Sequence, residues 1–82
     1  MPDPGVPAVD WVVDCTGLAC PLPVAKTAQA MKDLAVGQVL ELLATDPGVE
    51  PDMRAWARRT GNELLGVTKQ AEVFHVLLRR VK

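Results

Sequence analysis

The sequence has 82 residues, 49% of them hydrophobic, with nine basic side chains against ten acidic ones and a formal net charge of −1. A chain of this length forms one small domain, and its near-neutral charge gives no electrostatic reason to expect a nucleic acid or an anionic membrane as a partner. Two cysteines are too few for a secreted fold held together by disulfides. We therefore expect a cytoplasmic protein that spans no membrane and does not bind nucleic acid directly.

The first eight residues contain three prolines and lack both the basic and the apolar region of a signal peptide. This composition is typical of a flexible terminal tail. From Val9 onward, no low-complexity tract or linker divides the chain. We expect residues 1–8 to be a flexible N-terminal tail and residues 9–82 to be a single domain.

The N-terminal half predicts a strand, a helix and a second strand. Val9–Cys15 is rich in β-formers and ends at Thr16-Gly17, a pair typical of a tight loop. Helical spacing of apolar residues predicts a helix over Pro21–Ala35, ended by Gly37. Gln38–Thr45 is too apolar for a surface helix, which favours a strand. The inner face expected for the helix consists of Val24, Ala28, Met31 and Ala35.

The C-terminal half predicts a second helix and then a hairpin. The helix starts between Val49 and Pro51 and ends at Gly61, because glycine favours the left-handed cap of a helix. Glu63–Lys69 and Glu72–Lys82 are predicted as two strands joined at Gln70-Ala71, with a bulge at Gly66. The helix is expected to bury Val49, Met53, Trp56, Ala57 and Thr60 and to expose Arg54, Arg58 and Arg59.

The order βαβαββ predicts an α/β (α+β) two-layer sandwich with two helices on one face of a four-stranded mixed sheet. The first two strands are expected to pair in parallel, since the helix between them supplies the crossover. No helix covers the other face of the sheet, and the last strand carries apolar residues on both faces. We expect this uncovered face to meet a partner or a second copy, in a monomer or weak homodimer.

Cys20 is the candidate reactive residue. If Pro21 is the first helical residue, Cys20 is the N-cap, where the free N–H groups and the positive end of the helix dipole favour a thiolate and lower the thiol pKa. Pro21 and Pro23 have no N–H, so the Leu22 N–H is the expected hydrogen-bond partner of the Cys20 sulfur. Lys26, about one and a half turns further on, would add positive potential. The alternative is that Cys20 is a small, inert core residue.

Other chemistry finds little support in the sequence. It has no glycine-rich phosphate loop, no carboxylate pair at a recognisable spacing and no Ser/His/Asp set. Cys15, Cys20 and His75 lack the paired spacing of a structural zinc site. We expect no metal and no cofactor.

Two alternatives stay open from the residues alone. Cys15 is either a core residue at the end of its strand or the partner of Cys20 in a disulfide that acts as a redox switch. The second alternative is that the chain is a non-catalytic regulatory or interaction module with an inert cysteine, and that it uses a basic patch to bind RNA or an acidic protein. The residues that would form such a patch are Arg54, Arg58, Arg59, Arg79, Arg80 and Lys82.

The stretch Asp14-x-x-Gly17-Leu18-x-Cys20-Pro21-x-Pro23 resembles the Cys-Pro-x-Pro signature of the TusA/SirA sulfur-carrier family. The resemblance covers the chain from about Val9 to the C-terminus. It includes Thr45-Asp46-Pro47, Asp52, Trp56 and Thr60-Gly61-Asn62-Glu63-Leu64.

This resemblance implies a sandwich like the C-terminal domain of translation initiation factor three. It also implies that Cys20 accepts sulfane sulfur as a persulfide from a cysteine desulfurase or rhodanese-type donor and passes it to a cysteine of a downstream acceptor protein. The pathway would be tRNA thiolation, cofactor synthesis or dissimilatory sulfur oxidation.

The same resemblance assigns roles to individual residues. It implies that Asp14, Gly17, Pro21, Leu22 and Pro23 support the motif and its turn. Some family members have an acidic residue at the position of Leu22, so the surroundings of the sulfur are more apolar here. The residues that we expect to contact a partner are Lys26, Asp46 and Arg54.

Overall fold

The structure, a computed structural model, describes residues 8–82, so residues 1–7 of the predicted tail lie outside the described residues. The chain forms the predicted βαβαββ order. The elements are β1 (Trp11–Cys15), α1 (Leu22–Met31), β2 (Val39–Ala44), α2 (Val49–Thr60), β3 (Glu63–Gln70) and β4 (Val73–Arg79).

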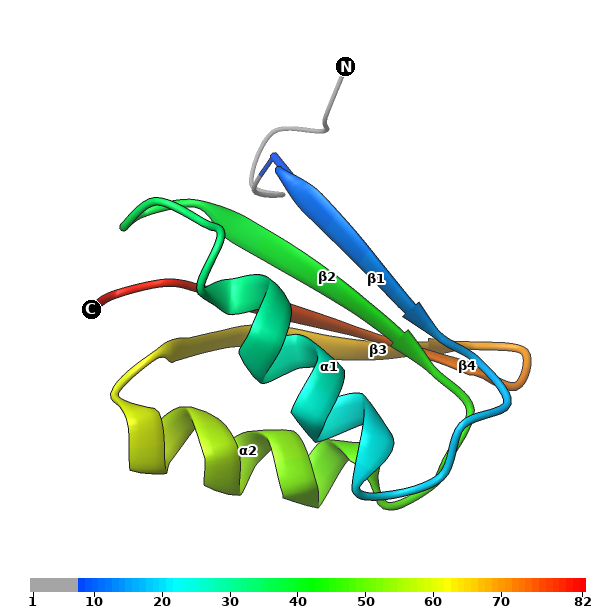
Figure 1. Cartoon of the computed structure of the whole chain (residues 1–82). Coiled ribbons are helices and arrows are strands. Elements are labelled where there is room, and N and C mark those ends of the chain that lie inside the picture. The colour runs from blue at the N-terminus through cyan, green and yellow to red at the C-terminus, as the bar shows by residue number, and fades with distance from the viewer. Residues whose placement is uncertain (1–7) are drawn as a thin grey trace.

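The strands form one mixed sheet in the order β1-β2-β4-β3 (Figure 1). β1 pairs with β2 in parallel, as the intervening helix requires, whereas β4 is antiparallel to both β2 and β3. The carboxyl ends of β1 and β2 therefore lie at the same edge of the sheet. The loops that follow these two strands meet there.

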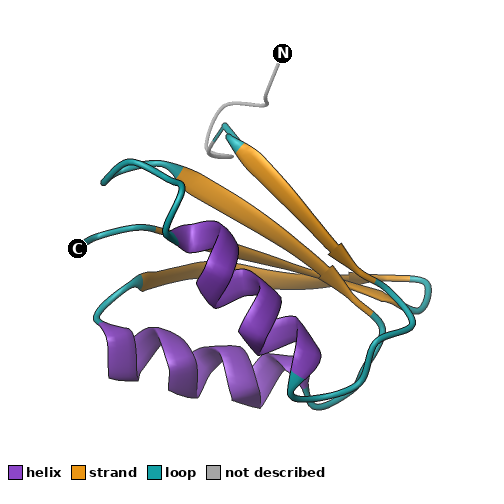
Figure 2. Ribbon diagram, viewed as in Figure 1, coloured by secondary structure: helices purple, strands orange, loops and turns teal. Residues whose placement is uncertain are grey.

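Both helices cover the same face of the sheet, which confirms the predicted two-layer sandwich (Figure 2). The strands present Leu40, Leu42, Val76 and Leu78 to the helix layer, and all four side chains are fully buried. Burying one such side chain contributes about 1.5–3 kcal/mol relative to leaving it exposed. The helices complete the core with Met31, Val49, Met53, Trp56 and Ala57.

Helix α1 is shorter than predicted and buries a different set of residues. It ends at Met31 rather than Ala35, and two turns follow in which Asp33 and Leu34 donate to carbonyls three residues earlier. The guanidinium of Arg80 donates to the carbonyls of Met31, Lys32 and Leu34, which satisfies the helix end from another element.

The prediction of the inner face of α1 is partly wrong. Pro23 and Thr27 are buried with Met31, while Ala35 is exposed beyond the helix. The prediction assigned Pro23 only to the turn before the helix. Its buried ring instead belongs to the inner face, together with Thr27 one turn later. The inner face of α2 is confirmed except that Thr60 is only half-buried.

The C-terminal hairpin has the predicted bulge and a shifted turn. The register between β3 and β4 slips between Leu64 and Gly66, so the bulge is confirmed. The turn lies at Ala71 and Glu72 rather than at Gln70 and Ala71, and Ala71 has a φ of 55°. β4 ends at Arg79, earlier than predicted, and β1 starts at Trp11 rather than Val9.

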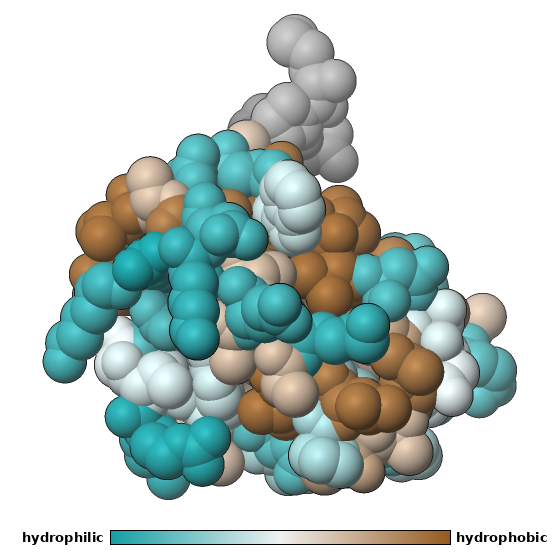
Figure 3. Space-filling model, in the orientation of Figure 1, coloured by the Kyte–Doolittle hydropathy of each residue, from teal (hydrophilic) through white to brown (hydrophobic). Residues whose placement is uncertain are grey.

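The sheet face away from the helices carries pairs of oppositely charged or ionisable side chains. The Nδ1 of His75 lies 3.8 Å from a carboxylate oxygen of Glu41, and Arg79 lies 3.7 Å from Glu63. On the helix side, apolar surface forms separate patches among hydrophilic ones (Figure 3). Among the described residues, no helix has the length and apolar character that crossing a membrane requires.

Candidate functional site

Cys20 lies in the loop that connects β1 to α1, and its side chain is exposed. The position differs slightly from the prediction, since α1 begins at Leu22 and Pro21 occupies the N-cap position. Cys20 therefore precedes the helix by one more residue than expected. Its sulfur is still at the N-terminal end of α1, but it does not cap the helix.

The Leu22 N–H does not bond the Cys20 sulfur. It donates to the Ala19 carbonyl at 3.0 Å, which closes a turn around Cys20. The first helical bond of α1 runs from the Ala25 N–H to the Pro21 carbonyl, also at 3.0 Å. The prediction counted the free N–H groups correctly but missed the turn carbonyl, a better acceptor than sulfur.

Two hydrogen bonds fasten the Cys20 loop to the loop after β2. The Gly17 N–H donates to the Thr45 hydroxyl oxygen at 2.9 Å, and the Cys20 N–H donates to Asp46 Oδ2 at 2.9 Å. The two loops run side by side in Figure 1 because they leave parallel neighbouring strands. Asp46 thus fixes the backbone of the cysteine itself.

The loop also stabilises itself at its start. Asp14 Oδ1 accepts hydrogen bonds from the Thr16 N–H at 3.0 Å and the Thr16 hydroxyl at 2.7 Å, and these bonds lower the pKa of Asp14. Gly17 then adopts a φ of 80°, a left-handed conformation that favours glycine. The motif residues Asp14 and Gly17 therefore shape the turn that leads to Cys20.

Carboxylates surround the sulfur, which overturns the predicted electrostatics. The pKa of Cys20 is raised, first by a hydrogen bond to the side chain of Asp52, then by partial burial and by the negative charges of Asp52 and Asp46. A Cβ built at Gly48 would lie 3.7 Å from an oxygen of each of these two aspartates. The free protein therefore holds Cys20 as a thiol.

The role of Asp52 was missed in the sequence. In the sequence Asp52 appears only as part of the family resemblance, and in the structure it lies in the first turn of α2, near the positive end of the helix dipole. The available signal was topological: α2 starts just after β2, so its first turn lies at the same sheet edge as the Cys20 loop. Neighbouring carboxylates act directly on the sulfur and raise the pKa of its thiol.

Cys15 occupies a different environment five residues earlier. Its side chain at the end of β1 is fully buried in the core, and burial raises its pKa. Lys26 lowers the Cys15 pKa in part, whereas the groups that shift the Cys20 pKa are Asp52 and Asp46. The structure has both thiols free, with no bond between them.

The remaining predicted contact residues spread around the loop. Leu22 exposes 47% of its surface next to Cys20, whereas Pro23 faces the core. Asp46 also accepts the Gly48 N–H at 3.1 Å, and these backbone bonds lower its pKa. Arg54 is exposed on α2, where its guanidinium pairs with Glu50 at 2.8 Å.

Neither a metal cluster nor a single basic patch is gathered at the site. Within residues 8–82, no three His, Cys, Asp or Glu side chains come together as ligands. Three of the predicted basic-patch residues have other contacts: Arg54 pairs with Glu50, Arg79 with Glu63, and Arg80 binds the carbonyls that end α1.

Comparisons with known proteins identify the family. The profile of the family described as sulfurtransferase TusA matches residues 12–80. The chain belongs to the TusA family. Relatives that it matches are named as sulfur carrier proteins.

Two relatives show how much of a protein this domain represents. The putative sulfur carrier protein YrkF of Bacillus subtilis is 49% identical over 69 residues, which cover 84% of this chain but 37% of that protein. The sulfur carrier protein TusA of Allochromatium vinosum is 39% identical over 71 residues, covering 87% of this chain and 93% of that protein. The chain thus spans about a third of the first relative and nearly all of the second.

A solved structure confirms the fold. The SirA-like protein of Desulfitobacterium hafniense superposes with a TM-score of 0.77 at 22% sequence identity, over 88% of this chain and 99% of that one. At this level of identity the similarity concerns the fold. The TusA/SirA resemblance predicted from the sequence is therefore confirmed for both family and architecture.

Proposed function

We propose that Cys20 carries sulfane sulfur as a persulfide between two partner proteins. The observation that supports this is exposure: of the two cysteines in the sequence, Cys20 is exposed and Cys15 is fully buried. Sulfur exchange needs an accessible sulfur on both partners. Since a sulfur carrier must have a donor and an acceptor, the exposed thiol is where both would dock.

The loading step conserves atoms and electrons. The Cys20 thiolate attacks the outer sulfur of a donor persulfide, so a new sulfur–sulfur bond forms at Cys20 and the bond within the donor persulfide breaks. The donor sulfur leaves as a thiolate and takes a proton to become a thiol. Cys20 is oxidised to a persulfide and the donor cysteine is reduced, without an external oxidant. Unloading repeats the step with the acceptor's thiolate as the attacking group.

Asp52 is the group that acts most strongly on the proton of Cys20. Its carboxylate accepts the hydrogen bond of the thiol, and its charge keeps the thiol protonated in the free protein. A carrier whose thiol stays protonated until a partner docks reacts slowly with oxidants and alkylating agents. The proton that leaves Cys20 on loading is balanced by the proton that the departing donor sulfur takes up.

The surroundings of Cys20 suggest how a partner docks. Exposed Leu22 offers an apolar contact beside the sulfur. Asp46 and Arg54 supply opposite charges on the loop after β2 and on α2, and Lys26 supplies a positive charge on α1. We propose a cysteine desulfurase or rhodanese-type protein as the donor and a protein with a reactive cysteine as the acceptor, in tRNA thiolation, cofactor synthesis or sulfur oxidation.

The proposal is tested by loading the purified protein from a sulfane-sulfur donor and measuring the mass of each cysteine peptide. We expect a gain of one sulfur on the Cys20 peptide and no gain on the Cys15 peptide. Cys20→Ser should abolish loading, while Cys15→Ala should load like the wild type. An unchanged sulfur load in Cys20→Ser would exclude the proposal.

A further inference from the structure

The two edges of the sheet are built differently. β3 forms one edge, and it carries a bulge at Leu64–Gly66 and ends in the exposed polar residues Thr68, Lys69 and Gln70. Bulges and lysines are devices that prevent an edge strand from pairing with another chain. β1 forms the opposite edge, where Trp11 and Val12 expose 54% and 53% of their surfaces. Among the described residues, β1 has neither a bulge nor a lysine.

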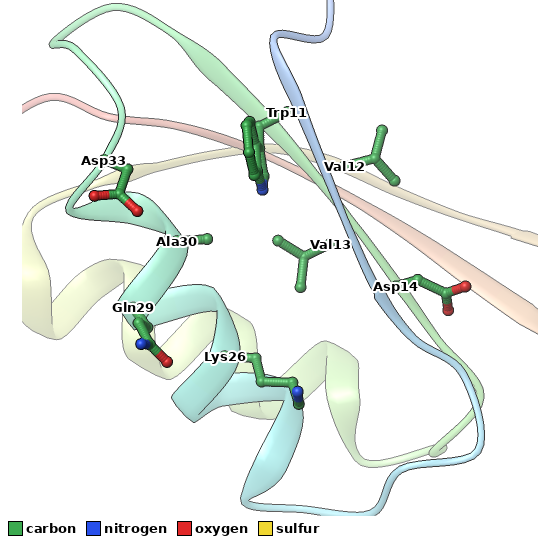
Figure 4. Close-up of a pocket in the computed structure, with 8 residues that line it drawn as sticks. All are labelled: Trp11, Val12, Val13, Asp14, Lys26, Gln29, Ala30 and Asp33. Atoms are coloured by element: carbon green, nitrogen blue, oxygen red, sulfur yellow. The ribbon is translucent and has the colours of Figure 1, made fainter.

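A groove runs along this unprotected edge. It lies between β1 and α1, with a volume of about 340 Å³ (Figure 4). Trp11 and Val13 point from β1 toward Ala30 on α1, and Lys26 and Asp33 lie farther along the helix on either side of Ala30. Val12 and Asp14 point to the opposite side of the strand. An added strand would therefore face Val12 with one side and this groove with the other, and the groove has both apolar and polar lining, the polar part from Lys26, Gln29 and Asp33 of the α1 side.

The backbone at this edge is available for pairing. The Asp10 N–H donates inward to the Val39 carbonyl at 2.8 Å. Asp10 precedes β1, and within the strand the pairing is set by β2: Leu40 and Leu42 direct their N–H and C=O groups toward β4, so Glu41 and Leu43 direct theirs toward β1. The groups of Trp11 and Val13 therefore pair inward, and those of Val12 and Asp14 point outward. Within residues 8–82, no strand pairs with this side of β1.

The charges on this edge disfavour a second copy of the chain. A two-fold axis through Val12 would place Asp10 of one copy opposite Asp14 of the other, twice in each dimer. Like charges directly opposite each other destabilise a strand pair, whereas opposite charges stabilise it. The edge therefore fits a strand with basic residues at the two positions facing Asp10 and Asp14.

We propose that the outer edge of β1 binds an extended segment of a partner protein as a fifth strand. The segment has five residues: a basic residue at each end and three apolar residues between them. The second and fourth side chains enter the groove beside Val13 and Trp11, and the third packs on Val12. Because this pattern is symmetric, the segment can pair with β1 in parallel or antiparallel. Its binding does not depend on the sulfur chemistry at Cys20.

The probe for this surface is a capped peptide with the core Lys-Val-Val-Val-Lys, titrated into the full chain and followed by amide NMR shifts. The matched control peptide has Glu in place of both Lys. We expect amide shifts at Val12 and Asp14 with the basic peptide, none at Thr68 and Lys69 on the other edge, and binding at least several times weaker for the acidic peptide. Equal binding of the two peptides, binding at β3, or no binding of the basic peptide would overturn the proposal.

Backbone methylation separates strand addition from a simple charge contact. N-methylation of the peptide at alternate residues should abolish binding in one set and leave it intact in the other, because only one set of N–H groups faces β1. Asp10→Asn with Asp14→Asn should weaken binding severalfold while both side chains keep an acceptor for Val39 and Thr16. Dimerisation of the free protein through β1, seen by sedimentation, would assign the edge to a second copy instead.

Discussion

The two cysteines of this chain are five residues apart in sequence and belong to different parts of the molecule. Cys15 ends a strand whose parallel pairing with β2 places the side chain in the core beneath both helices. Cys20 lies beyond the turn at Gly17, in a loop that two hydrogen bonds and the packing of Leu18 attach to the rest of the protein. Secondary structure decides which of the two thiols a partner can reach.

The comparison also teaches that a raised pKa can have two different origins. Burial is the main cause at Cys15, so no partner relieves it without unfolding the strand. Carboxylates are the main cause at Cys20, so a partner that brings positive charge or displaces Asp52 relieves it at once. Packing in the core makes the Cys15 thiol unreactive, whereas neighbouring negative charge keeps the exposed Cys20 thiol protonated.

The largest expected effect is the difference in alkylation between the two thiols. In the native protein, iodoacetamide should modify Cys20 at least about 10³ times faster than Cys15, because Cys15 reacts only when the core opens. Peptide mass spectrometry over time measures both rates. The two rates should converge in concentrated urea, and comparable rates in the native state would contradict the assigned burial.

Much of this comparison was available from the sequence. Apolar periodicity and the Gly17 and Gly61 signals predicted the element order, and the position of Cys15 at a strand end was correct. The charge around Cys20 was not predictable from local spacing, because Asp46 and Asp52 are 26 and 32 positions away. They reach the sulfur only through the parallel pairing of β1 and β2, which brings both loops to one sheet edge.

Helix α1 shows the same limit in a second place. Its predicted extension to Ala35 followed from the helical spacing of its apolar residues, but a side chain from the far end of the chain binds the carbonyls that end the helix at Met31. Arg80 was assigned to a surface patch because nothing near it in sequence indicated otherwise. Local patterns predicted what each segment forms, and tertiary contacts decided where it ends.

The next largest effect is expected from Asp52→Asn. Removing the carboxylate should lower the pKa of Cys20. The charge that disfavours the thiolate is lost, and so is the carboxylate that accepts the hydrogen bond of the thiol. Cys20 should then react severalfold faster with iodoacetamide at pH 7, and its rate profile should shift to lower pH. Stopped-flow alkylation from pH 6 to 10 measures the shift.

A matched control is available in the same turn of α2. Glu50→Gln removes an acidic side chain whose charge is paired with Arg54 rather than directed at the sulfur. Its rate profile should overlay that of the wild type. A profile that shifts equally in both variants would mean that general negative charge, and not the contact with Asp52, controls the thiol.

A smaller change of the same sign is expected from Gly48→Lys. Gly48 has a φ of −76°, which any residue can adopt, and a Cβ there lies in ordinary contact with oxygens of Asp46 and Asp52. The added ammonium should offset their charge and lower the pKa of Cys20, but the Asp52 hydrogen bond stays. Alkylation at pH 7 should be faster than in Gly48→Met, which adds similar bulk without charge. Equal rates in the two variants would contradict the electrostatic account.

The smallest effect is expected in stability, where Asp46→Asn removes one of the two backbone bonds that its carboxylate accepts from Cys20 and Gly48. These bonds lower the pKa of Asp46 in the folded protein, so the unfolded chain binds its proton more readily. The stabilisation is complete above the unfolded pKa of about 3.9 and is lost as pH falls through the lower folded pKa.

The Tm of Asp46→Asn should therefore lie below that of the wild type at pH 7, and the difference should shrink as the pH falls below about 4. Thermal unfolding followed by circular dichroism from pH 7 to pH 2 tests this. Asp14→Asn should show a separate acid response from its bonds to Thr16. A Tm difference for Asp46→Asn that stays constant across this range would show that its carboxylate charge does not hold the Cys20 loop, and that Cys20 stays in place through Gly17 and Thr45 alone.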